Sequence, residues 1–447
     1  KMSESIVDNI YKNGKMRHIF LEYLFPFFVQ LIVNFVCVEC SIMVNILLYI
    51  LYLAVYMILY TDLIFEDENK ELIEVCEVCK EYDDEVVELD DHLSWKYYQN
   101  KSFRMKINAI YEELNTKLCV KLNSYCDVFD VRDFKTVYEL NLARCTNITN
   151  VNMLHNVHTL NLSGCTSITN VNKLGSVHEL DLGKTNISDV SKLGTVHTLN
   201  LNGCYNIVDV SALGNVHTLN LSSCLINDVS KLGSVNTLIL NYCENLVDVS
   251  GLLNVNTLYL NHCDKITDVS ALGNIHTLDL TNCNNIIDVS NLGLVRNLNL
   301  SGCVKITDVK QLSTVHTLNL SYTRVSDVND LKFVYNLNLS GGNNIKNVSK
   351  LDSVHNLNLS HMKNVNDVNM LHSVKILDLS YNKKIKDVGN LRNLTSLTVS
   401  EDVQGIHLLK NLKELIILSY FGKRKYITKG VLKKLKKINP NVKIIHK

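Results

Sequence analysis

Three residue types that can do chemistry recur along this chain at nearly fixed spacing: cysteine, histidine and aspartate. Thiolates, imidazoles and carboxylates are the usual nucleophiles, general bases and metal ligands of proteins. Here each type returns every 20 residues, or every 19 where one residue is missing. A fixed period of that length indicates a repeated structural unit, so the recurring side chains must first be explained as parts of a repeat.

Eight of the fourteen cysteines share one position of the repeat, which we call the cysteine slot. Regular recurrence favours a small buried side chain that donates one weak hydrogen bond. No cysteine or histidine completes a metal-ligand set at the usual spacing, so we expect reduced thiols rather than disulfides or a metal site. Cys76 and Cys79 form a single CxxC pair, which we assign to an acidic helix. The eight slot residues are Cys145, Cys165, Cys204, Cys224, Cys243, Cys263, Cys283 and Cys303.

Histidine and aspartate occupy two further slots. A file of imidazoles could bind metal or respond to pH, but asparagine, arginine, tyrosine and lysine also occur in the histidine slot, which favours a simple stacking row. A carboxylate before each return turn can accept backbone N–H bonds, and the glycine–aspartate pattern of calcium-binding solenoids is absent. The histidines are His158, His178, His197, His217, His276, His316 and His355. The aspartates are Asp189, Asp209, Asp228, Asp248, Asp268, Asp288, Asp308, Asp327, Asp367 and Asp387.

The hydrophobic pattern predicts the elements that position these slots. Each unit has a leucine–any–leucine triplet, as at Leu160 and Leu162, which is typical of a short strand with one buried face. An isoleucine, a valine and a leucine follow at intervals of three, as in Ile266, Val269 and Leu272. No room remains for a full α-helix, so we predict extended or 3₁₀ returns. Stacked units must share one core beside a parallel sheet, because a single unit cannot bury its leucines.

This pattern resembles the leucine-rich repeat family, whose LxxLxLxxN/C signature is matched at Val157, Leu160, Leu162 and Cys165. The tail of each unit is similar to the short-return subclass of bacterial internalins and phosphatase regulators, and the 20-residue wording is similar to repeat proteins of giant DNA viruses of amoebae. The resemblance covers roughly residues 118–447. It implies an α/β solenoid: a leucine-rich repeat arc with a parallel β-sheet on the concave side and short extended or 3₁₀ returns on the convex side, plus an N-terminal helical region.

Residues 1–65 are predicted to form an apolar transmembrane hairpin with spans at 19–38 and 41–61. The second span has 21 residues without a charge, which is long enough to cross a bilayer as a helix. Basic residues before the first span and acidic residues after the second favour an inside N-terminus. Two spans then leave the repeats in the cytosol, as the thiols also favour, whereas one span puts them outside. The alternative is a soluble cytoplasmic protein, in the host cell if the source is viral.

The rest of the chain divides into three predicted regions. Residues 66–117 form an acidic helical linker and N-terminal cap, residues 118–420 the repeat array, and residues 421–447 a basic C-terminal cap. Aromatic residues of the first cap are expected to close the core: Trp95, Tyr97, Tyr98 and Phe103. The second cap reads as an amphipathic helix before a final strand, with these residues expected to face inward: Val431, Leu432, Leu435 and Ile438.

Departures from the repeated sequence pattern indicate the candidate site. The residues that flank the strand leucines are mostly threonine, asparagine, serine and glycine, which make a bland surface. Bulky side chains break this pattern in two adjacent units and again further along, and exposed aromatics are typical of contact hot spots. The predicted partner-binding residues are Ile239, Tyr242, Tyr259, His262, Tyr322, His361 and Tyr381.

The predicted function is a non-enzymatic protein–protein interaction scaffold that is membrane-associated through residues 19–61. The chain has no dinucleotide-binding, P-loop, esterase or zinc-protease motif, so we predict no enzymatic activity, no cofactor, no metal and no small-molecule substrate. The 45 basic and 45 acidic residues balance, which gives no general attraction to nucleic acid. The alternative is an F-box-like substrate adaptor of a ubiquitin ligase, with residues 62–110 binding the ligase core.

Overall fold

The computed structural model describes residues 86–114, 117–122, 127–400, 403–418, 427 and 429–446. The predicted apolar hairpin at residues 1–65, with both of its spans, lies outside the described residues, and so does the CxxC pair. Within the described part of the chain, no helix is both long and apolar enough to cross a membrane. The chain divides into two compact units. The first comprises residues 1–122 and 136–140, and the second comprises residues 123–135 and 141–447.

The first unit contains a small helical region beside two strands. Its described elements are β1 (Val86–Glu88), α4 (Asp91–Gln99), α5 (Lys101–Leu114) and β2 (Lys117–Lys121). Strands β1 and β2 pair in parallel. Helix α4 is capped at its N-terminus by Asp90, whose side chain accepts a hydrogen bond from the N–H of Leu93 at 2.8 Å. The predicted N-terminal helical region is therefore present.

The aromatic residues of this unit differ in their burial. Tyr97 and Phe103 are fully buried, and the Tyr97 hydroxyl donates to Oδ1 of Asn108 at 2.6 Å, which satisfies its only polar group. Trp95 and Tyr98 are only half-buried, with ring centroids 5.4 Å apart. Two of the four aromatic residues expected to be inside are thus core residues.

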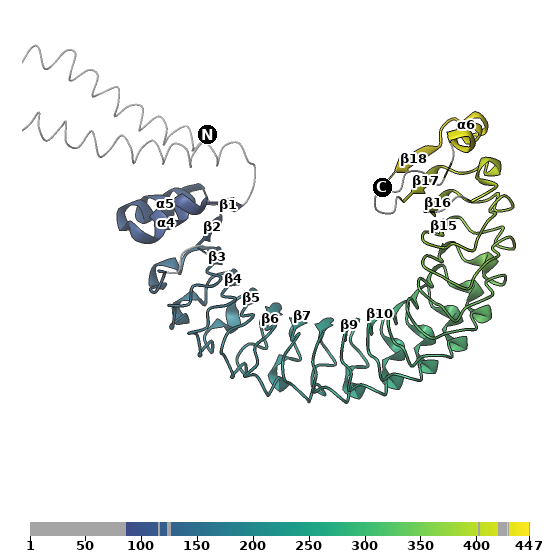
Figure 1. Cartoon of the computed structure of the whole chain (residues 1–447). Helices are drawn as coiled ribbons and strands as arrows, with labels where there is room; N and C mark the ends of the chain where they lie inside the picture. The colour runs from purple at the N-terminus through teal and green to yellow at the C-terminus, as the bar shows by residue number, and fades with distance from the viewer. Residues whose placement is uncertain are drawn as a thin grey trace, which may run out of the picture. The chain divides into compact units, whose positions relative to one another are not determined.

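The second unit is a repeat array of short parallel strands. Strand β3 (Glu139–Asn141) spans the boundary between the units. The strands that follow are β4 (Thr159–Asn161), β5 (Glu179–Asp181), β6 (Thr198–Asn200), β7 (Thr218–Asn220), β8 (Thr237–Ile239), β9 (Thr257–Tyr259), β10 (Thr277–Asp279), β11 (Asn297–Asn299), β12 (Thr317–Asn319), β13 (Asn336–Asn338), β14 (Asn356–Asn358), β15 (Ile376–Asp378), β16 (Ser396–Val399), β17 (Glu414–Ile417) and β18 (Lys443–His446). They line the inner side of the arc that this unit forms (Figure 1).

Short 3₁₀ turns of three to five residues form the returns on the outer side of the arc (Figure 1). They are η2 (Arg132–Phe134), η3 (Asn152–Leu154), η4 (Leu174–Ser176), η5 (Ser211–Leu213), η6 (Ser250–Leu252), η7 (Ser270–Asn274), η8 (Ser290–Leu294), η9 (Lys310–Thr314), η10 (Asn329–Phe333), η11 (Leu351–Ser353) and η12 (Ile406–Leu408). The prediction of returns without a full α-helix is confirmed, since too few residues remain after each strand.

The core of the array is a stack of identical apolar layers. Strands pair so that each central leucine lies beside the next one, as Leu258 lies between Leu238 and Leu278. All three are fully buried, while the residues on either side of each leucine face the concave surface. Burial of one leucine contributes about 2 kcal/mol, and every unit adds several such residues, so the layers hold the array together.

Units of 19 residues keep this register because the missing residue falls in the turn after the strand, not in the strand. Strand β12 still pairs residue for residue with β13 across a 19-residue unit. In that unit Thr323 fills the cysteine slot, and its hydroxyl donates to the carbonyl of Leu320 at 2.7 Å. The length change is therefore absorbed locally, and the sheet continues unchanged.

The C-terminal helix α6 (Lys429–Ile438) and the final strand β18 form as predicted, but the inward face of α6 is narrower than expected. Leu435 is fully buried, Val431 and Leu432 are half-buried, and Ile438 is 44% exposed. Ile438 lies in the last turn of the helix, three residues beyond Leu435, and the prediction that it faces inward was wrong.

Candidate functional site on the concave face and its rim

The cysteine slot builds a buried ladder of thiols. The Sγ atom of Cys263 donates to the carbonyl of Leu240 in the preceding unit at 3.1 Å, and that of Cys283 to Leu260 at 3.0 Å. Burial raises the pKa of the Cys263 thiol to about 11 and that of Cys303 to about 12. The thiols are thus protonated at neutral pH and serve packing, as the sequence predicted.

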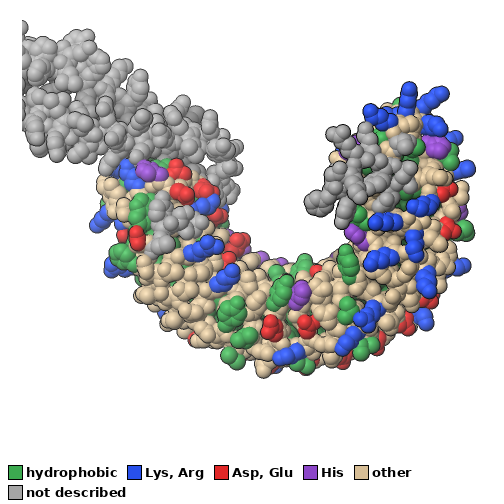
Figure 2. Space-filling view, in the orientation of Figure 1, with side chains coloured by type: hydrophobic (Ala, Val, Ile, Leu, Met, Phe, Trp, Pro, Cys, Tyr) green, Lys and Arg blue, Asp and Glu red, His purple; other side chains and the backbone are tan. Residues whose placement is uncertain are grey.

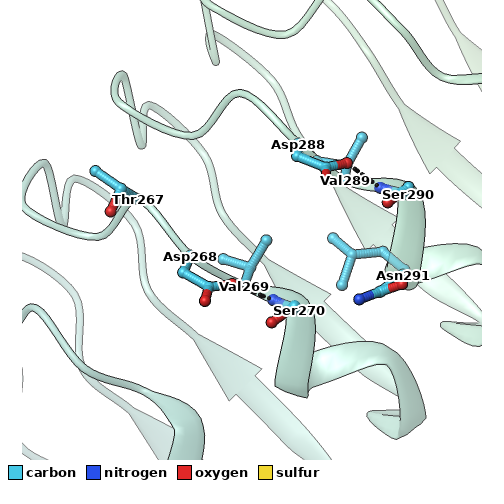
Figure 3. Close-up of a pocket in the computed structure, with 9 residues that line it drawn as sticks. Thr267, Asp268, Val269, Ser270, Asp288, Val289, Ser290 and Asn291 are labelled. Carbon is cyan, nitrogen blue, oxygen red and sulfur yellow. Dashed lines mark hydrogen bonds between the residues drawn. The ribbon is translucent and has the colours of Figure 1, made fainter.

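The aspartate slot shapes the return turns. Oδ1 of Asp268 accepts from the N–H of Ser270 at 2.9 Å, and Oδ1 of Asp288 accepts from the N–H of Ser290 at 2.8 Å. Both turns line a shallow hollow between adjacent units (Figure 3). These backbone bonds lower the pKa of both carboxyl groups. The predicted turn role is confirmed. Over the described residues, no three side chains of metal-ligating type form a group that could hold an ion.

The histidine slot forms stacked rows of rings. The imidazoles of His158, His178, His197 and His217 lie in one file, with successive centroids 4.6, 4.6 and 4.7 Å apart. In a second file, Tyr335 lies between His316 and His355 at 5.0 and 4.5 Å. The predicted stacking row is confirmed, because strand spacing sets the ring spacing.

One slot just after each strand adopts a left-handed backbone, with φ between 56° and 74° in thirteen successive units. Its N–H donates to the next unit, as Tyr242 donates to the carbonyl of Asn261 at 2.8 Å. Glycine fits this conformation without steric cost, whereas other residues lose about 1–2 kcal/mol. The thirteen residues of this left-handed slot are Arg144, Gly164, Lys184, Gly203, Ser223, Tyr242, His262, Asn282, Gly302, Tyr322, Gly341, His361 and Tyr381.

The structure brings the four predicted residues of the central units together as two pairs. Ile239 in β8 lies in register with Tyr259 in β9, and both are half-buried on the concave face. Tyr242 and His262 lie in the left-handed slot, and their rings stack with centroids 4.6 Å apart at 10°. We call these four residues the central cluster. Asn282 extends it, since its Nδ2 lies 3.1 Å from Nε2 of His262.

The three other predicted residues also lie in the left-handed slot, and we call them the distal cluster. His361 and Tyr381 stack at 4.5 Å. Tyr322 covers Gly341, where an added Cβ would meet its ring at 2.5 Å. Sequence reasoning identified these residues as outward-facing but missed their left-handed backbone. The recurrence of glycine at the same slot, as in Gly164 and Gly203, was the available signal.

Comparisons with known proteins add little beyond the fold. No protein-family model matches the chain, and no curated protein matches it. Short parallel strands, paired buried leucines, a cysteine slot and 3₁₀ returns nonetheless define the architecture. The fold is a leucine-rich repeat solenoid.

Solved structures of other leucine-rich repeat proteins match at low identity. An internalin (inlF) of Listeria monocytogenes is 22% identical over 63% of this chain and 83% of that chain, with a TM-score of 0.43. The functional domain of InlJ from the same organism, described as including a cysteine ladder, is 19% identical over 64% and 75%, with a TM-score of 0.42. A Leptospira interrogans leucine-rich repeat protein is 17% identical over 71% and 98%, with a TM-score of 0.47. The likeness to giant-virus repeats stays a prediction.

Proposed function

We propose that this leucine-rich repeat protein is a non-enzymatic scaffold that holds a protein partner on its concave face, at the central cluster. The observation that carries the proposal is the in-register pair Ile239 and Tyr259, beside the stacked pair Tyr242 and His262. Tyr242 is 52% exposed. The equivalent strand positions elsewhere are mostly asparagine, so this patch offers apolar and aromatic area that the rest of the face lacks.

The shape of the site supports a protein partner rather than a small molecule. The central cluster lies on a sheet surface and its rim, where contact area is broad and shallow. Small ligands instead prefer enclosed apolar cavities. The hollows between units, such as those at 267–292 and 208–232, are lined by aspartates already engaged in turn formation.

Photocrosslinking tests this proposal. A photoreactive amino acid at Tyr259, expressed in the full chain, is expected to capture one discrete partner, whereas the same group at Leu294 is not. Leu294 is 78% exposed at the end of η8, which makes it a control for general apolar exposure. Equal labelling at both positions would show that the central cluster has no special partner.

Affinity for the captured partner then measures the patch. Ile239→Asn with Tyr259→Asn restores the side chain common at this position, as in Asn299 and Asn319. We expect binding to weaken by about 30-fold or more, since hot-spot residues are worth at least about 2 kcal/mol. Unchanged affinity with an intact circular dichroism spectrum would remove the central cluster as the site.

Membrane tethering through residues 19–61, with the repeats facing the cytosol, remains part of the proposal on sequence grounds alone. Protease protection of the membrane-inserted full chain tests it: cytosolic repeats are digested without detergent, and repeats on the far side are not. Recovery of the whole chain in a soluble fraction would instead support the cytoplasmic alternative. Among the described residues, no observation favours the ligase-adaptor hypothesis.

A further inference from the structure

Charge is separated along the leucine-rich repeat array, although the full chain sums to zero. Residues 127–295 contain eight Lys and Arg against fifteen Asp and Glu, a net charge of −7. Residues 296–420 of the array contain 15 Lys and Arg against ten Asp and Glu, a net charge of +5, and the C-terminal cap at 421–447 adds ten Lys and Arg without any Asp or Glu. Figure 2 shows Lys and Arg side chains gathered over the C-terminal half of the array. The balance of the whole chain therefore hides a strongly basic surface.

The cations concentrate between the cysteine slot and the turn position of five successive units, which holds an aspartate in four of them and Asn347 in the other. All are exposed, none has an ion-pair partner among the described residues, and no carboxylate shares these positions. The adjacent turn aspartates already accept backbone N–H bonds, as Asp387 does from Gly389 at 2.9 Å. The seven cations are Lys305, Arg324, Lys346, Lys363, Lys383, Lys384 and Lys386.

Each aromatic residue of the distal cluster lies two residues before one of these cations. Tyr322 precedes Arg324, His361 precedes Lys363, and Tyr381 precedes Lys383. The Tyr322 side chain is 58% exposed. Because the left-handed slot fixes the backbone in every unit, ring and cation recur along the rim in the same order. We call these three rings and the seven cations the basic–aromatic rim.

We propose that the basic–aromatic rim binds single-stranded nucleic acid. Every nucleotide carries a phosphate and a base with a π-face, and single-strand binders combine a positively charged track with aromatic side chains for stacking. The rim repeats that pair of groups, whereas an acidic peptide offers carboxylates without regular rings. This surface and ligand are distinct from the protein site at the central cluster.

The acidic half of the array does not cancel this attraction. Asp264 is the last acidic residue at the position of Arg324, and it lies three units earlier. Lys305, the first cation of the rim, lies two strand spacings from Asp264, about 10 Å, and Arg324 about 14 Å, whereas the Debye length at physiological salt is about 8 Å. The rim therefore presents its own potential to a polyanion.

Fluorescence anisotropy of a labelled 20-nucleotide oligo(dT) with the full chain tests the proposal. We expect saturable binding. The logarithm of the association constant should fall linearly with the logarithm of salt concentration, with a slope of about −0.7 for each phosphate contacted. Lys383→Gln, Lys384→Gln and Lys386→Gln together should weaken binding at least tenfold and reduce that slope. The control triple replaces Lys173, Lys184 and Lys192 of the acidic half with Gln and should leave binding unchanged.

Ring stacking has its own test, because charge alone does not require Tyr322. Tyr322→Ser should weaken oligo(dT) binding by about tenfold, since stacking on one aromatic ring is worth about 1–3 kcal/mol. Serine fits this backbone, as Ser223 shows in the same slot. Tyr205→Ser in the acidic half, where the side chain is 61% exposed, is the control and should leave oligo(dT) binding unchanged.

Three results would overturn the proposal. One is the absence of oligo(dT) binding by the wild-type chain at low salt. Another is equal weakening by both lysine triples. The third is unchanged binding by Tyr322→Ser with displacement of the oligonucleotide by poly-glutamate at equal charge, which would assign the rim to acidic proteins instead.

Discussion

The two halves of the leucine-rich repeat array share one backbone but differ in what it carries. Up to Cys303 the cysteine slot holds mostly thiols and the surface is acidic; from Thr323 onward the slot holds no thiol and the surface is basic. Both halves place aromatic rings in the same left-handed slot, beside Glu244 in one and Arg324 in the other. The backbone thus fixes the position of each ring. The charge of the residue two positions after the ring then determines which ligands the ring can help to bind.

Alkaline pH should give the largest difference in stability between the two halves. Burial raises the pKa of eight thiols, from Cys119 to Cys303, above the model-compound value of 9.0. A thiol whose folded-state pKa lies above its unfolded value contributes its full stabilisation below pH 9. This stabilisation is lost as pH rises through the folded-state pKa. Between these two pKa values, each such cysteine lowers the free energy of unfolding by about 1.4 kcal/mol per pH unit.

We therefore expect the thiol half to unfold between about pH 9 and pH 12, while units from Thr323 onward keep their protection. Hydrogen exchange with peptide mass analysis, at stepped pH, reads out each half separately. Simultaneous loss of protection in both halves would mean that the thiols do not set the alkaline limit.

Truncation of a shared core leucine should weaken both halves together. Leu278 is fully buried in β10, between the central and distal clusters. Leu278→Ala is expected to lower the free energy of unfolding by about 2–5 kcal/mol. Urea denaturation measures the change, and Thr277→Ser, at a half-buried neighbouring position, should cost far less. A cost below about 1 kcal/mol would contradict a continuous core.

Charge exchange at the central cluster should transfer oligonucleotide binding to the acidic half. Glu244→Arg with Asp264→Lys gives Tyr242 and His262 the cationic neighbours that the distal rings have. If the residue two positions after the ring sets recognition, oligo(dT) binding in a rim-neutralised background should rise about tenfold, since two added phosphate contacts increase affinity and its salt slope. The reciprocal check is loss of this gain above about 0.5 M salt.

Backbone strain at the left-handed slot gives the smallest expected effect. Ser223 holds φ at 60°, which costs a non-glycine residue about 1–2 kcal/mol, whereas glycine costs about 0.5–1 kcal/mol in lost chain entropy. Ser223→Gly should therefore stabilise the array by about 0.5 kcal/mol in urea titrations. Thr169→Gly, outside the left-handed slot, should destabilise it, and a gain in both would point to a non-local cause.

The fold was predictable from the sequence because the period exposes it. Leu160 and Leu162, the cysteine slot and the aspartates before each turn could be assigned from spacing alone, and each assignment is confirmed. Ile438 was misplaced, since helical spacing from Leu435 does not show where the helix leaves the surface it covers.

The candidate site was less accessible to sequence reasoning. The residues were selected by their departure from the repeated sequence pattern, but the stacking of Tyr242 on His262 depends on strand register and on a left-handed backbone. The net charge of the whole chain gave no sign of the rim. Opposite charges in distant units cancel in that sum, but they do not screen one another beyond a Debye length. The domain boundaries and the membrane hairpin stay predictions.

Uniform stacking has a consequence for how such a protein can change. Tyr242 and Tyr322 stand four units apart, which is roughly 19 Å at one strand spacing per unit. Adjacent units repeat the same strand register and core leucine contacts. Gain or loss of one unit between the two surfaces would change their separation by one strand spacing. Their separation can therefore change only in whole steps of this size.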